Sequence, residues 1–220
     1  FNDDMILNAP VTPEYYFRNG QPCDNNRESF NIVPTYKPGE KFGITLNMLA
    51  NIGILNAHFD RWESVRQSPR RWYGPHLGMS GVFLSCLLRN QKNFIGFPYR
   101  HFEQPFLKSV FEEVWRCEPG LMQEACSRFR KDTSAMQYLF RYWQFASNRF
   151  WPVRNLRGVP FYYMRQDMLE EIERTLNNPH VLSVCLNDSP EIKDDEFEAI
   201  CRGLHDMLER KFPEKTAFEI

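Results

Sequence analysis

The last third of the chain alternates strand-like and helix-like segments, and this order constrains the fold more than any other feature of the sequence. "GVPFYYMR" (158–165) and "HVLSVCLND" (180–188) have the apolar and aromatic character of strands. Residues 166–178 and 194–212 have the amphipathic spacing of helices, and Pro213 ends the second one. Strand, helix, strand, helix is typical of a βαβ unit. We therefore predict a helix-rich α/β fold with a short, mostly parallel sheet.

The central part of the chain is predicted to be helical. Apolar residues recur at helical spacing over 42–90, which indicates three or four helices. A long connecting loop is expected before them, over 19–41, where Gly, Pro and Asn are frequent. Another loop, "FIGFPYRHFEQP", carries His101. Further helices are expected over 105–115, 118–129 and 135–151.

The composition excludes several classes of protein. With 15% aromatic residues the chain has the means to build a packed core, which disordered chains lack. The formal net charge is -1, so no overall field attracts nucleic acid or anionic lipid. No apolar run approaches the roughly 20 residues of a membrane helix, and no signal peptide is evident. We expect no nucleic-acid partner and no integral membrane segment, while a peripheral membrane association stays open.

The six cysteines form no CxxC pair and no dense framework. Most of them have apolar neighbours, so reduced thiols in the core are expected rather than disulfides or zinc ligands. This usage weakly favours a cytosolic setting.

Two apolar segments adjoin Asn-Asp pairs. Asn187 and Asp188 follow "VLSVCL", and "FNDD" is interpreted as the tail of a second strand whose body lies upstream of residue 1. Because ligands gather beyond the carboxyl ends of parallel strands, Asp3, Asp4, Asn187 and Asp188 are expected to converge. Their oxygens are the ligands that Mg²⁺ or Mn²⁺ prefers. The alternative is turn chemistry, in which these side chains bond to nearby backbone.

A histidine and two arginines complete the candidate site. His101 has the pKa range of a proton acceptor for a sugar hydroxyl, although a lone histidine is more often a surface or capping residue. Arg128 and Arg130, in "SRFRKD", suit phosphate oxygens, with solvated charge at a helix boundary as the alternative. The chain has no P-loop, GxGxxG, HExxH or GxSxG motif, which weakens ATPase, dehydrogenase, zinc protease and lipase interpretations.

As an ordered set, these segments resemble the Stealth family of sugar-phosphate transferases. The resemblance is carried by "FNDDM", "HFEQPFLKSVFEEVW", "RFRKDTSAMQYLFRYWQ", "VCLNDS" and "LERKFPEKTAFE". The family comprises capsule and cell-wall polysaccharide enzymes of bacteria, and the catalytic subunit of the animal lysosomal-enzyme GlcNAc-1-phosphotransferase is a relative. The resemblance implies a single catalytic domain over 1–220 that contains the second to fourth signature regions. The first region is absent, so the N-terminal part of the fold is expected to be missing here.

The resemblance also implies an activity. The family transfers hexose-1-phosphate from a nucleotide-sugar, here expected to be UDP-linked, to a glycan hydroxyl, and so forms a phosphodiester in capsular polysaccharide or exopolysaccharide. A bacterial enzyme of this kind would be cytoplasmic, whereas an animal relative would face the Golgi lumen. Two other functions stay open, namely a metal-dependent glycosyltransferase that moves only the sugar and a non-catalytic carbohydrate-binding domain.

By motif, the resemblance assigns roles to individual residues. Asp3 and Asp4 match the family's acidic pair, and Asn187 with Asp188 matches its Asn-Asp, which together imply the Mg²⁺ site. Asp3, Asn187 and Arg128 would also bind the donor. His101 matches the family's histidine, as general base or as a nucleophile that forms phosphohistidine, and Arg130 matches the arginine that would stabilise phosphoryl charge.

Glu103 departs from the family pattern, because many relatives have a small residue or proline after the histidine. Its carboxylate is expected either to orient His101 or to be an acid at a helix start.

Overall fold

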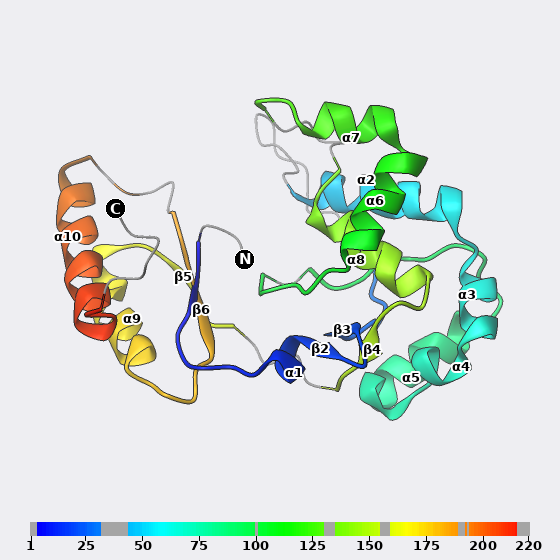
Figure 1. Cartoon of the computed structure of the whole chain (residues 1–220), viewed down its shortest axis with the longest axis horizontal. Helices are drawn as coiled ribbons and strands as arrows, with labels where there is room; N and C mark the ends of the chain where they lie inside the picture. The colour runs from blue at the N-terminus through cyan, green and yellow to red at the C-terminus, as the bar shows by residue number, and fades with distance from the viewer. Residues whose placement is uncertain are drawn as a thin grey trace. The chain divides into compact units, whose positions relative to one another are not determined.

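The computed structural model describes residues 4–31, 44–99, 101–129, 135–154, 159–188, 192 and 194–214 (Figure 1). Its contacts divide the chain into two compact units. The first unit comprises Phe1–Thr12, His101–Glu103 and Arg157–Ile220, and the second comprises Pro13–Arg100 and Gln104–Leu156. None of the helices in the described ranges combines the length and apolar composition that crossing a bilayer requires. The single domain expected over 1–220 stays a prediction.

The first unit contains the predicted βαβ element. Strand β5 (Phe161–Tyr163) is followed by the 3₁₀ turn η2 (Gln166–Met168) and helix α9 (Leu169–Leu176), and the chain then returns as β6 (Ser183–Asn187). Strands β5 and β6 pair in parallel. Helix α10 (Asp194–Lys211) follows and ends ahead of Pro213, as predicted.

The sheet is mixed, so the prediction of a mostly parallel sheet is wrong. Its order in the described residues is β1-β6-β5, and β1 (Met5–Leu7) pairs antiparallel to β6, with Met5 opposite Cys185. Asp4 directly precedes β1, because the apolar residues of this strand follow the acidic pair. The predicted strand body upstream of residue 1 stays a prediction. Antiparallel pairing nevertheless sets Asp4 beside the end of β6, because the backbone N–H of Leu186 donates to the Asp4 carbonyl at 2.8 Å.

The two faces of this sheet have different environments. Helices α9 and α10 lie along one face (Figure 1), where alternate strand residues join them in a core. That core contains Ile172, Leu176, Val184, Leu186, Ile200 and Leu204, with Ile6 and Tyr162 packed against it. Because paired residues of neighbouring strands point to the same face, the intervening positions belong to the opposite face. These positions are Met5, Cys185, Asn187, Phe161 and Tyr163.

The second unit is mostly helical. Four α-helices occupy its described residues 44–87, which confirms the predicted helical region: α2 (Ile44–His58), α3 (Arg61–Gln67), α4 (Pro69–Trp72) and α5 (Gly78–Leu87), with the 3₁₀ turn η1 (Pro75–Leu77). Three later helices are α6 (Lys108–Cys117), α7 (Pro119–Ala125) and α8 (Gln137–Ala146). Every residue from Tyr138 to Ala146 is buried, as suits an aromatic helix at the centre of a core.

One local prediction for this unit is corrected. The region 19–41 is not a loop at its start, because β3 (Gln21–Asp24) pairs antiparallel to β2 (Phe17–Arg18) and parallel to β4 (Trp151–Pro152). The remainder of that region lies outside the described residues from 32 onward. The short helix α1 (Pro13–Tyr16) precedes β2.

The cysteines are free, as expected, but only two of the six are in the core. Cys23 and Cys185 are buried, whereas Cys86, Cys117, Cys126 and Cys201 are exposed. Apolar neighbours in the sequence failed as a guide because, on a helix, adjacent residues point to different sides.

Candidate functional site

An aspartate and a histidine from distant parts of the chain form the centre of the candidate site. Nε2 of His101 lies 2.7 Å from Oδ2 of Asp4, and the two residues are 97 positions apart. Their side chains are 19% and 16% exposed, so the pair is largely shielded but reachable. His101 lies outside any helix or strand, as predicted, and the ring of Phe161 meets its imidazole edge to face at 5.4 Å between centroids. This geometry is that of a carboxylate that orients an imidazole.

A cysteine also contacts the carboxylate of Asp4. The Cys185 thiol donates a hydrogen bond to Asp4 Oδ2 at 3.2 Å. Burial, the hydrogen bond to Asp4 and the Asp4 charge together raise the pKa of Cys185 to about 12, and burial is the largest cause. The thiol is therefore protonated at neutral pH and acts as a donor. Sequence reasoning missed this residue, although its place two positions before Asn187 on one strand was a usable signal.

The second oxygen of Asp4 has a different environment. Oδ1 is buried, and among the described residues it has no hydrogen-bond partner. Asp4 also lines a cavity of about 330 Å³ at the end of β6, together with Asn187 and Asp188. Buried polar atoms without partners are rare in native proteins. Asp4 Oδ1 is therefore suited to a ligand that enters from outside the chain.

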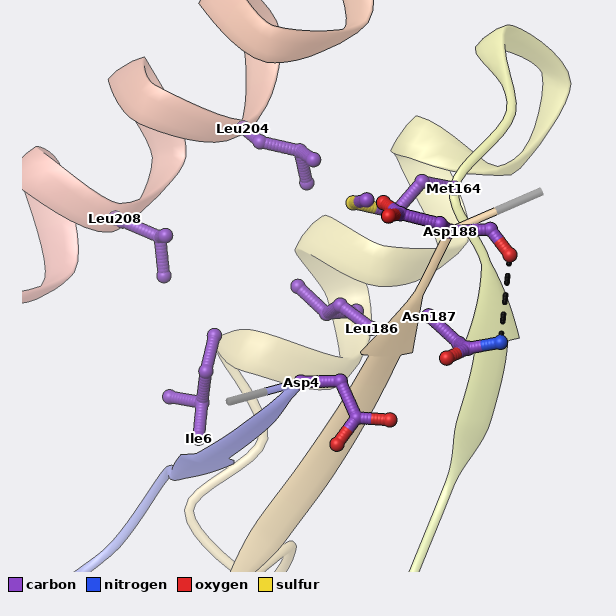
Figure 2. A pocket seen from close by; sticks show the side chains of 8 residues that line it. All are labelled: Asp4, Ile6, Met164, Leu186, Asn187, Asp188, Leu204 and Leu208. Atoms are coloured by element: carbon purple, nitrogen blue, oxygen red, sulfur yellow. Dashed lines mark hydrogen bonds between the residues drawn. The ribbon is translucent and has the colours of Figure 1, made fainter. Parts of the chain in front are cut away.

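The cavity has a polar rim and an apolar wall. Figure 2 shows Leu204 and Leu208 of α10 pointing toward Ile6 and Leu186 of the sheet, and Met164 completes this wall. The carboxylate of Asp4 and the amide of Asn187 border the cavity at the end of β6, on the side of the strand that points away from Leu204 and Leu208 (Figure 2). The cavity thus has an apolar wall and is bordered by three polar residues, a combination that is common in small-molecule sites.

Asn187 and Asp188 permit both interpretations made from the sequence. The Asn187 side-chain nitrogen donates to the Asp188 backbone carbonyl at 3.3 Å, which is the local contact that the turn interpretation predicts. Both residues also line the cavity with Asp4, and the Asp188 side chain is exposed. The oxygens of these three residues are of the hard kind that Mg²⁺ or Mn²⁺ prefers, and Figure 2 shows the Asp188 carboxylate beside Met164, apart from that of Asp4. Metal binding itself stays a prediction.

The position of the three remaining predicted residues relative to this site is not described. Asp3 and Arg130 lie outside the described residues. Arg128 is exposed after α7 in the second unit, and its guanidinium carbon lies 5.4 Å from the centroid of its neighbour Phe129. The roles predicted for these three residues therefore stay predictions.

Glu103 is buried, and it is not an acid at a helix start. Helix α6 begins at Lys108, beyond the loop that contains Glu103, so the helix-start interpretation is wrong. The predicted start of this helix at Pro105 was too early for the same reason. Oε1 of Glu103 is buried and has no hydrogen-bond partner in the described part of the chain. Its role in orienting His101 stays a prediction.

Comparison with known proteins identifies relatives that cover the whole chain. No protein-family model matches it. It is 28% identical to the capsular polysaccharide phosphotransferase WcwK of Streptococcus pneumoniae over 100% of this chain and 63% of that protein. It is also 28% identical to the receptor polysaccharide phosphotransferase WefC of Streptococcus oralis, with the same coverage. The exopolysaccharide phosphotransferase cps2G of Lactiplantibacillus plantarum is 29% identical over 100% of this chain and 62% of its own length.

The three relatives are named as polysaccharide phosphotransferases, which agrees with the general class of enzyme that the sequence resembles. The chain spans less than two thirds of the length of each of them.

Proposed function

We propose that this chain is the catalytic part of a transferase that moves hexose-1-phosphate from a nucleotide-sugar, UDP-linked, to a glycan hydroxyl. The product would be a phosphodiester in capsular polysaccharide or exopolysaccharide. The observation that carries the proposal is the Asp4–His101 pair beside a cavity with an oxygen-lined rim. It gains weight because the chain is similar along its whole length to polysaccharide phosphotransferases.

His101 would handle the proton of the acceptor. With Nε2–H donating to Asp4, the basic lone pair of the imidazole is on Nδ1. As general base, Nδ1 takes the proton from the acceptor hydroxyl while the oxygen of this hydroxyl bonds to the phosphorus that carries the donor sugar. The bond from that phosphorus to the bridging oxygen breaks, and the nucleoside monophosphate leaves with the electron pair. In the covalent alternative, Nδ1 attacks the phosphorus and displaces the nucleoside monophosphate, which leaves with the electron pair. In a second step the acceptor oxygen displaces Nδ1 from the phosphorus, and the released imidazole takes up the hydroxyl proton.

The carboxylate of Asp4 would have a separate role for each oxygen. Oδ2 accepts from His101 and Cys185, which fixes the imidazole tautomer and stabilises the positive charge that forms on it. Oδ1, with Asn187 and Asp188, would hold Mg²⁺, and Asp3 is proposed to join them. When bound, such an ion neutralises diphosphate charge and improves the leaving group. Arg130 would stabilise the transferred phosphoryl oxygens, and Arg128 would bind the donor.

The proposal is tested by phosphorus NMR on the full-length natural protein with Mg²⁺, UDP-sugars and glycan acceptors. We expect a phosphodiester resonance and release of UMP, and we expect a chelator to abolish both. Release of UDP without phosphorus in the glycan would instead establish an ordinary glycosyltransferase. Sugar binding that survives chelation, with no product of either kind, would establish a non-catalytic carbohydrate-binding domain. The cytoplasmic location belongs to this proposal and depends on the capsule role.

His101→Gln isolates the proposed proton transfer. We expect it to lower turnover by about 10²–10⁴-fold, the usual contribution of general acid–base catalysis, and to leave donor affinity nearly unchanged. The matched control is His180→Gln, because His180 is exposed in a turn of the same unit and does not line the cavity. Unchanged turnover in His101→Gln would contradict both the base and the nucleophile roles.

A further inference from the structure

Two aromatic side chains are exposed next to the candidate base. Phe161 and Tyr163 of β5 are 39% and 49% exposed. Their ring centroids are 5.1 Å apart with an interplanar angle of 88°, and Phe161 also contacts the imidazole of His101. We call Phe161 and Tyr163 the aromatic pair. Exposed apolar rings that adjoin each other are more often binding surfaces than isolated exposed residues are.

The alternation of β5 directs the aromatic pair away from the core. Tyr162, between them, faces the helices, where its hydroxyl lies 2.8 Å from the Thr175 hydroxyl. Phe161 and Tyr163 therefore point to the opposite face, which they share with Cys185 and Asn187, their partners in register on β6. This face also carries the thiol that holds Asp4. The aromatic pair is thus part of the same surface as the candidate catalytic groups.

The distance to His101 identifies which substrate this surface fits. A general base must lie about 2.6–3.2 Å from the hydroxyl that it deprotonates. A ring centred 5.4 Å from the imidazole therefore borders the sugar that carries this hydroxyl. The nucleobase of a donor is separated from the reacting phosphorus by a ribose and a phosphate, so it is not expected at this distance.

We propose that the aromatic pair is the acceptor subsite, where a pyranose ring packs its apolar C–H face on one aromatic ring and is bordered by the other. This inference rests on the proposed function, because it uses His101 as the group that meets the acceptor hydroxyl. Aromatic rings supply a large apolar area, and the Tyr163 hydroxyl adds a polar group. The near-perpendicular arrangement of the two rings means that one sugar face can stack on only one of them.

The test compares variants that keep or remove the ring. Phe161→Leu keeps an apolar side chain without the ring, whereas Phe161→Tyr keeps the ring. We expect Phe161→Leu and Tyr163→Leu to raise the acceptor KM by about tenfold, the effect of one aromatic contact, with a smaller change in kcat and in the donor KM. Phe161→Tyr is expected to retain most of the acceptor affinity. Phe83→Leu, at an exposed position of α5, controls for the loss of a surface aromatic ring.

A second measurement separates this inference from the proposed function. Saturation-transfer NMR on the full-length protein, without donor, uses the methyl glycosides of glucose, galactose and N-acetylglucosamine as probes. We expect saturation transfer to the ring protons of at least one sugar, and its loss in Phe161→Leu but not in Phe83→Leu. That result without phosphodiester formation would keep the sugar subsite and overturn the proposed transfer. Equal acceptor KM in Phe161→Leu and Phe161→Tyr, a donor KM shift instead, or no sugar signal in the wild type would overturn the subsite.

Discussion

The ion pair between Arg141 and Asp24 yields a stability prediction whose size follows from its burial. Nε and Nη2 of Arg141 donate to the two Asp24 oxygens at 2.7 and 2.8 Å, and both side chains are 1% exposed. The Asn25 backbone N–H also donates to Asp24 Oδ1 at 2.6 Å. Asp24 therefore forms a two-point ion pair with a guanidinium that is buried in the core of the second unit.

The perturbation is Asp24→Asn, which keeps the shape of the side chain and the acceptor for the Asn25 N–H. It removes the negative charge that faces the buried guanidinium of Arg141. Breaking a buried pair from one side destabilises a protein by about 3–5 kcal/mol, because the remaining charge is desolvated without compensation. Adding Arg141→Met removes that charge, so the double variant is expected to be more stable than Asp24→Asn alone.

Urea unfolding followed by tryptophan fluorescence reports on the relevant unit, because the five tryptophans all belong to it. They are Trp62, Trp72, Trp115, Trp143 and Trp151. Glu112→Gln is the control, since the Glu112–Lys108 pair is exposed and contributes little. A loss below about 1 kcal/mol in Asp24→Asn, or additive losses in the double variant, would refute the reasoning, because either result means that the pair is effectively solvated.

Two further predictions concern titration and reactivity. Burial alone would raise the pKa of Glu113, but hydrogen bonds from Trp143 and Arg149 and the charge of Arg149 lower it overall below 4.5. The resulting stability is present above pH 4.5 and is lost as pH falls through the folded pKa of Glu113. Glu113→Gln should therefore reduce the loss of unfolding free energy between neutral and acidic pH. An unchanged loss in this variant would contradict the assignment. Iodoacetamide at pH 8 should modify the four exposed cysteines and spare Cys185, whose pKa is about 12. Mass spectrometry identifies the modified residues. Modification of Cys185 in the folded protein would contradict the prediction, because it would show that the thiol is accessible.

The helices and the βαβ element could be predicted because their signals are local. The 166–178 segment repeats apolar residues at helical spacing, and it lies between two apolar runs that then pair in parallel, as right-handed crossovers allow. The direction of β1 could not be predicted in this way. Three apolar residues, Met5 to Leu7, carry no directional signal, and their pairing with β6 depends on contacts with the far end of the chain.

The convergence of Asp4 with Asn187 and Asp188 was predicted from the ends of two parallel strands, and the structure brings these residues to one cavity through an antiparallel pair. Convergence requires only that the residues lie at the same edge of the sheet. Parallel pairing brings two strand ends to that edge, and antiparallel pairing brings the start of β1 beside the end of β6. The Asn-Asp pairs therefore indicate which residues lie at the edge of the sheet, but they do not indicate the direction of the strands.

Cys185 shows what that signal omits. Strand β6 is buried from Ser183 to Leu186, so its sequence reads as one apolar run in which no residue stands out. Only the register with β1 and β5 shows that Val184 and Leu186 face the helices while Cys185 faces Asp4. The two faces of this strand are therefore chemically different, and the thiol on the face away from the helices is the group that donates to the Asp4 carboxylate. For such strands, the residue two positions before the terminal Asn-Asp pair is the place where a positioning group should be sought.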